Sequence, residues 1–119
     1  MVRSELVRRL VLTSISDDFE NVDQVILRDV ANAGAKCGLT IERSEVVDAL
    51  ARLIEDGLAK AYLLSGTTRD PFSGECQGMP PMAIIEEAFT TYFYITKKGM
   101  DFLLSEDTWW PFDDEGRPR

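Results

Sequence analysis

The stretch from Thr40 to Thr96 constrains the fold most, because it joins a helical pattern directly to strand-forming sequence. Residues 45–58 contain apolar side chains at the spacing of a buried helical stripe, namely Val46, Val47, Leu50, Leu53 and Ile54. Thr40 is a favoured N-cap residue, and Gly57 stands where a left-handed C-cap is expected. The pattern predicts an amphipathic helix that ends at Gly57 and leads into a strand.

Two strands are predicted after this helix. Residues 58–64 are apolar without helical punctuation, and residues 89–95 are rich in the aromatic and β-branched residues that favour strands. Thr96 follows as the cap of a closing helix. We expect the apolar side chains of that helix to pack inward, namely Met100, Leu103 and Leu104.

The segment between the two strands predicts a long hairpin. Residues 65–81 are rich in turn formers, namely Gly66, Pro71, Gly74, Gly78, Pro80 and Pro81. Residues 82–88 fit either a strand or a short helix, and Ile84 with Ile85 favours the strand. The tip of the hairpin is then expected near residues 71–81.

Two further helices are predicted before Thr40. Residues 4–14 and 22–37 each show a helical apolar stripe, and Gly38 is placed for a C-terminal cap. Only a few residues join the second helix to the third, which is the spacing of a helix-turn-helix.

Composition limits the possible functions. The chain has 119 residues, two cysteines and no histidine. A structural zinc site and catalysis by a Ser-His or Cys-His pair are therefore not expected. No glycine-rich phosphate loop occurs, and no apolar run approaches the ~20 residues that span a bilayer. We expect a non-enzymatic, cytoplasmic protein with no cofactor, no metal and no membrane association.

Two motifs resemble those of the winged helix-turn-helix superfamily. Residues 46–58, VVDALARLIEDGL, are similar to the recognition-helix segment of many bacterial regulators. Residues 92–103, YFYITKKGMDFL, look like the end of the wing in regulators of the MarR and PadR kinds. The resemblance implies an α+β, mainly α fold with a three-helix core, a long antiparallel hairpin wing and a short C-terminal helix. We expect residues 1–106 to form this winged-helix domain and residues 107–119 an acidic, aromatic tail.

The resemblance also implies a function. In such regulators the third helix enters the DNA major groove with the wing beside it, so this chain is expected to be a DNA-binding transcriptional regulator, with a homodimer as one possible assembly. The residues that would contact DNA are Arg43, Ser44, Arg52, Arg69, Lys97 and Lys98.

The charge pattern supports an alternative function. The net charge is −8, and helical spacing assigns to the outward face of the third helix the residues Ile41, Ser44, Glu45, Asp48, Arg52 and Glu55. Three of these are acids, and Arg52 is expected to pair with Asp48 or Asp56 on the helix surface. Because DNA affinity depends on Lys and Arg contacts to phosphates, the alternative is a winged-helix protein-interaction module that does not bind DNA.

The C-terminal tail carries an unusual aromatic cluster of Trp109, Trp110 and Phe112. Large aromatic side chains are seldom left in water. The cluster is expected to fold back onto the domain, to form a homodimer contact, or to dock on another protein, and the sequence leaves these three alternatives open.

Overall fold

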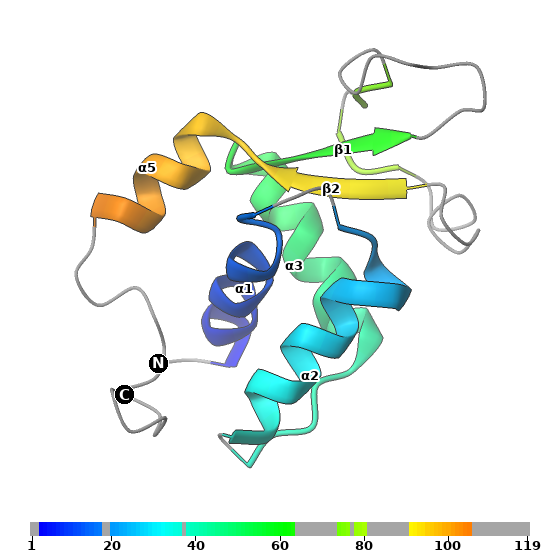
Figure 1. Ribbon diagram of the computed structural model, residues 1–119, viewed down its shortest axis with the longest axis vertical. Coiled ribbons are helices and arrows are strands. Elements are labelled where there is room, and N and C mark those ends of the chain that lie inside the picture. The colour runs from blue at the N-terminus through cyan, green and yellow to red at the C-terminus, as the bar shows by residue number, and fades with distance from the viewer. Residues whose placement is uncertain are drawn as a thin grey trace.

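A computed structural model describes residues 3–17, 20–36, 38–63, 74–76, 78–80 and 91–105 of the chain. This part is a small α+β domain, mainly helical (Figure 1). Its elements in chain order are α1 (Arg3–Ser14), the π-helix η1 (Val22–Ile26), α2 (Leu27–Lys36), α3 (Arg43–Glu55), β1 (Ala59–Leu63), β2 (Thr91–Ile95) and α5 (Lys97–Ser105).

The two predicted glycine caps are confirmed. Gly38 and Gly57 end α2 and α3 with positive φ angles of 74° and 77°, which a residue without a Cβ adopts at no steric cost. After α3, the amide of Gly57 donates to the Ile54 carbonyl at 3.0 Å and that of Leu58 donates to Leu53 at 2.9 Å. This pair of bonds is a Schellman motif, and it turns the chain directly from α3 into β1.

The predicted N-cap of α3 at Thr40 is wrong. Glu42 is the N-cap, and its backbone N–H donates to the Glu45 carboxylate at 2.9 Å in a capping box. Ile41 was expected on the outward face, but it is only 7% exposed. Its side chain packs against the backbone of Gly34 in α2. Because Ile41 precedes the first helical residue, the helical angle used to place it outward does not apply there.

The second predicted helix begins with a wider turn than expected. In η1 the Ile26 amide donates to the Asn21 carbonyl at 2.9 Å, one residue further than in an α-helix. This turn still places Val22, Ile26 and Val30 in the core, each at most 2% exposed. Gly34, inside α2, is buried, and Cys37, the last residue of the predicted helix, lies outside the described residues.

The sheet is antiparallel, with Ala61 opposite Phe93 and Tyr62 opposite Tyr92. Phe93 is fully buried. Its outer backbone edge pairs with Glu20, through amide-to-carbonyl distances of 2.9 and 2.7 Å. The segment between α1 and η1 therefore adds a bridge beside β2, so the order across the sheet is Glu20, β2, β1.

The predicted hairpin tip near residues 71–81 is wrong where the structure describes it. Residues 74–76 lie beside β1, because the Leu63 amide donates to the Gly74 carbonyl at 2.9 Å and the Cys76 amide donates to Ala61 at 2.8 Å. The chain therefore returns to the sheet at residues 74–76. Residues 82–88, predicted as a strand, lie outside the described residues.

The closing helix α5 begins as predicted. The hydroxyl of Thr96 accepts a hydrogen bond from the Gly99 amide at 3.0 Å, which identifies Thr96 as the N-cap. Leu103 is buried at 3% exposure, but Leu104, also expected to pack inward, is 76% exposed. Adjacent helix residues point about 100° apart, and α5 contacts the domain along one side.

Candidate functional site

The exposed face of α3 is the first candidate site, because the recognition helix of a winged-helix protein would use it. Burial of Val46, Leu50 and Leu53 on the opposite side determines which residues point outward. We call the resulting surface the α3 face, and it consists of Ser44, Asp48, Arg52 and Glu55. Two acids and one base make it net acidic.

Arg52 does not form the predicted pairs. Within the described residues it has no ion pair with Asp48 or Asp56, and the Asp56 carboxylate instead contacts Arg8 at 2.7 Å. Arg52 is therefore the positive charge of the α3 face that makes no ion pair among the described residues.

Glu45 is turned away from the α3 face and toward α1. Its carboxylate receives two bonds from the Arg3 guanidinium, at 2.6 and 3.2 Å. The hydrogen bond from Arg3, and then that from the Glu42 amide, lower the pKa of Glu45. The prediction that Glu45 belongs to the outward surface is wrong, because it is half-buried in this contact between helices.

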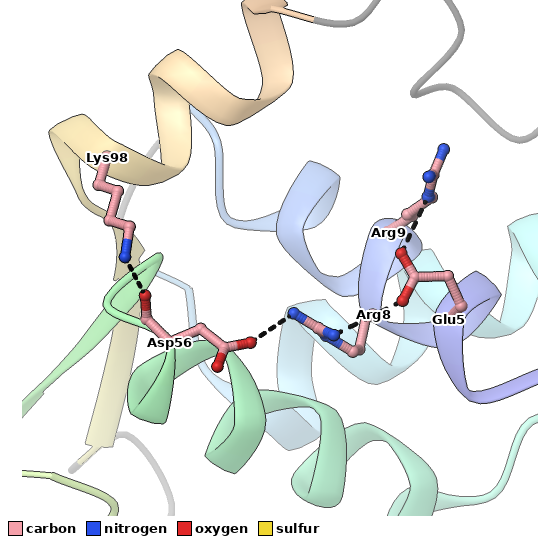
Figure 2. Close-up of polar contacts among 5 residues, drawn as sticks. All are labelled: Glu5, Arg8, Arg9, Asp56 and Lys98. Carbon is pink, nitrogen blue, oxygen red and sulfur yellow. Dashed lines mark hydrogen bonds and ion pairs between the residues drawn. The ribbon is translucent and has the colours of Figure 1, made fainter.

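A second charged junction ties α3 to both α1 and α5 (Figure 2). Arg8 contacts the Asp56 carboxylate, and the Lys98 ammonium donates to the Asp56 carbonyl at 2.8 Å. Glu5 also faces Arg8 at 3.5 Å and Arg9 at 3.3 Å. Arg8 and Lys98 both lie at the C-terminus of α3, where the helix dipole favours positive charge.

Of the other predicted DNA-contact residues, Arg43 and Ser44 begin α3, and Lys97 and Lys98 begin α5. The guanidinium of Arg43 is held by Asp23 on η1, at 2.7 and 3.1 Å. Lys97 faces Asp101 on α5 at 3.3 Å. Ser44 is exposed. Arg69 lies outside the described residues, as do the predicted contact residues of the tail, Trp109, Trp110 and Phe112.

Taken over the described residues, only Lys36 and Arg52 lack an acidic or carbonyl partner among the lysines and arginines. Lys36 ends α2, and Arg52 lies near the end of α3. Of the predicted basic contacts that the structure describes, Arg43, Lys97 and Lys98 already have an acidic or carbonyl partner, and Arg52 does not.

A third polar cluster fastens residues 74–76 to the sheet. Tyr94 donates a hydrogen bond to the Glu75 carboxylate, and Lys60 contacts the same carboxylate at 3.1 Å. The bond from Tyr94, and then that from Lys60, lower the pKa of Glu75. Burial, and then the bond to Glu75, raise the pKa of Tyr94. The cluster therefore joins residues 74–76 to both β1 and β2.

Sequence reasoning missed a groove of about 300 Å³ between α1 and α3. Its sides carry the Arg3–Glu45 pair at one end and Asp48 with Arg52 at the other. Helix periodicity predicts only on which face of its own helix each residue lies. The contact between Arg3 and Glu45 spans 42 positions, so no local pattern indicates which faces of α1 and α3 meet.

Comparison of the chain with protein-family models, curated proteins and solved structures returned no match. In the described part of the chain, no helix is long and apolar enough to cross a membrane. The same part holds no group of three or more Cys, Asp or Glu side chains that could bind a metal ion.

Proposed function

We propose that this chain is a non-enzymatic winged-helix domain whose α3 face binds a protein partner and does not enter the DNA major groove. The observation that carries the proposal is the charge of that face, on which Asp48 and Glu55 outnumber Arg52. Acidic side chains in the major groove would face phosphates that repel them.

The pairing of the basic residues supports the same proposal. To contact a phosphate, Arg43 would have to leave Asp23, and Lys98 would have to leave the Asp56 carbonyl. The two cations without such partners in the described part, Lys36 and Arg52, belong to different helices. DNA binding gains affinity from each neutralised phosphate, and this arrangement supplies few cations for that purpose.

The second candidate is a DNA-binding transcriptional regulator. The order of elements favours it, because α2 and α3 follow each other closely and two antiparallel strands come after α3. Fold alone does not decide function, so this candidate rests on topology and the first rests on charge.

A DNA titration separates the two candidates. The purified chain is titrated with fluorescent mixed-sequence duplex DNA at low salt and again at higher salt. The regulator would bind at low salt and lose affinity as salt rises, because bound cations release counterions. The protein-interaction proposal expects no saturable binding at low salt, and salt-sensitive binding would overturn it.

Crosslinking tests the partner directly. A photoreactive amino acid replaces Ser44 on the α3 face, and a matched variant carries it at Lys97 on α5, which is also exposed. In the producing cell, we expect the Ser44 variant to yield a discrete crosslinked protein that the Lys97 variant does not. Adding Asp48→Lys and Glu55→Lys should abolish that product, and persistence of the product would exclude the α3 face as the contact.

A further inference from the structure

The groove between α1 and α3 has a distinct chemical lining. Its volume is about 300 Å³, at the small end of the range for ligand sites in proteins. Val7 and Ala49 line it with side chains that are 2% and 4% exposed. The packed surfaces of the two helices therefore form an apolar floor to the groove, and charged residues surround it.

Most of these charges already have partners. Arg3 is held by Glu45 through two bonds, and Arg8 points to Asp56 and Glu5 (Figure 2). The pairs Arg3–Glu45 and Arg8–Asp56 join α1 to α3 beside the groove.

Asp48 and Arg52 are different. They lie one helical turn apart on α3, where side chains of opposite charge are close enough to pair. Both are exposed and both line the groove, yet neither has an ion pair within the described residues. The groove thus offers the Asp48 carboxylate and the Arg52 guanidinium, both without an ion pair, beside an apolar floor.

We propose that this groove binds a small zwitterion of the α-amino acid class with an aliphatic side chain. The Arg52 guanidinium receives the ligand carboxylate through paired N–H donors, the geometry that arginine favours. The Asp48 carboxylate accepts from the ligand ammonium group. The aliphatic side chain lies toward Val7 and Ala49, and the Ser4 hydroxyl, also in the lining, is a further donor.

The size and charge of the groove select this class over others. A nucleotide or polyphosphate would bring several negative charges against Asp48, and its volume exceeds so small a groove. A purely apolar ligand would leave Arg52 and Asp48 without partners. The inference does not rest on the proposed function, although a partner on the α3 face and this ligand would compete for Asp48 and Arg52.

The test uses the full chain labelled with ¹⁵N and titrated with L-leucine, with amide shifts followed by NMR. Two matched probes each lack one charged group: 4-methylpentanoate has no ammonium, and 3-methylbutylamine has no carboxylate. We expect saturable shifts at residues 4–8 and 45–52 with L-leucine, and weaker binding by about tenfold or more with each probe, because each probe lacks one of the two charged contacts, with Arg52 or with Asp48.

Variants complete the test. Arg52→Gln and Asp48→Asn should each weaken L-leucine binding by about tenfold or more. Glu55→Gln, on the same face of α3 but outside the groove lining, should leave it unchanged. Absence of saturable shifts, or equal binding of L-leucine and 4-methylpentanoate, would overturn the proposal. Equal losses in Glu55→Gln and Arg52→Gln would also overturn it.

Discussion

At the scale of single residues, two threonines that the sequence makes equally good caps have different roles. The Thr96 hydroxyl accepts from the Gly99 amide at 3.0 Å and donates to the Gly57 carbonyl at 2.7 Å. Thr40 precedes the true cap, Glu42, and among the described residues only its backbone carbonyl accepts a hydrogen bond, from Arg3. Whether a threonine caps a helix therefore depends on where the backbone places it relative to the first helical turn, and not on the residue type alone.

We predict that Thr96→Ala destabilises the domain by about 1 kcal/mol, the usual cost of losing an N-cap. A melting temperature lower by about 4 °C corresponds to that loss. The measurement is thermal unfolding followed by circular dichroism. Thr40→Ala is the matched control and should unfold at the temperature of the unmodified chain. Equal effects of the two substitutions would contradict the assignment of the cap.

Gly99 is a second residue whose role depends on its neighbours. A Cβ at this position would lie 2.2 Å from the Leu58 carbonyl oxygen and 2.7 Å from a side-chain carbon of Ile95. The close approach of α5 to the start of β1 therefore requires glycine. In an isolated helix, alanine would be preferred at the same position by about 1 kcal/mol.

We predict that Gly99→Ala lowers the free energy of unfolding by about 2 kcal/mol or more, because α5 must move away from the sheet. Gly38→Ala provides the comparison, since a Cβ there would meet nothing within 4 Å. Its cost is about 1 kcal/mol, from the left-handed backbone alone. Urea unfolding of both variants ranks them, and a smaller loss for Gly99→Ala would refute the close approach.

At the scale of helices and strands, long-range ion pairs determine how α1 lies on α3. The Glu45 carboxylate accepts hydrogen bonds from Arg3 on α1 and from the Glu42 amide in the capping box of α3. The same carboxylate therefore joins α1 to α3 and stabilises the N-terminus of α3. Its lowered pKa means that folding favours the charged form. The stability it contributes is present above its ordinary pKa of 4.5 and is lost as pH falls through the folded-state value.

We therefore predict that Glu45→Gln is less stable than the unmodified chain at neutral pH, and that this difference shrinks as pH falls below 4.5. Glu55→Gln, which changes the same charge on the exposed side of α3, should show a small difference at every pH. Chemical unfolding at a series of pH values measures both variants. A difference for Glu45→Gln that is constant with pH would show that the charged pair does not stabilise the helix contact.

Local pattern predicted the helices and strands well where short-range physics determines them. Both glycine caps and the cap at Thr96 are confirmed, since each depends on bonds within a few residues. The wide turn of η1 and the burial of Ile41 escaped prediction, because each is set by packing against other elements. The return of residues 74–76 to β1 also depends on distant partners, Tyr94 and Lys60.

The candidate site was less predictable than the fold. Helical spacing correctly placed Ser44, Asp48, Arg52 and Glu55 outward, since that result follows from the apolar stripe alone. It could not show that Asp56 would pair with Arg8, 48 positions away. That pairing leaves Arg52 free and helps to form the groove, so the features that suggest binding arise from tertiary contacts.

At the scale of the whole molecule, topology and charge favour different partners. The arrangement of α2, α3 and the two strands is compatible with a helix presented to a DNA groove. The net charge of −8 and the acids of the α3 face would repel the phosphates. If charge alone keeps α3 from DNA, then changing the charge without changing the fold should create binding.

We predict that the double variant Asp48→Lys, Glu55→Lys gains nonspecific affinity for duplex DNA that falls as salt rises, because its α3 face becomes a basic stripe with Arg52. The matched control is Asp17→Lys, Asn32→Lys, Leu104→Lys, which changes the net charge equally at exposed positions on three other segments. It should bind far more weakly, since three dispersed lysines contact few adjacent phosphates. Fluorescence anisotropy with mixed-sequence DNA compares the variants at equal salt. If both bind alike, overall charge and not the orientation of α3 controls DNA contact. In that case the comparison of α3 with a recognition helix has no support from binding.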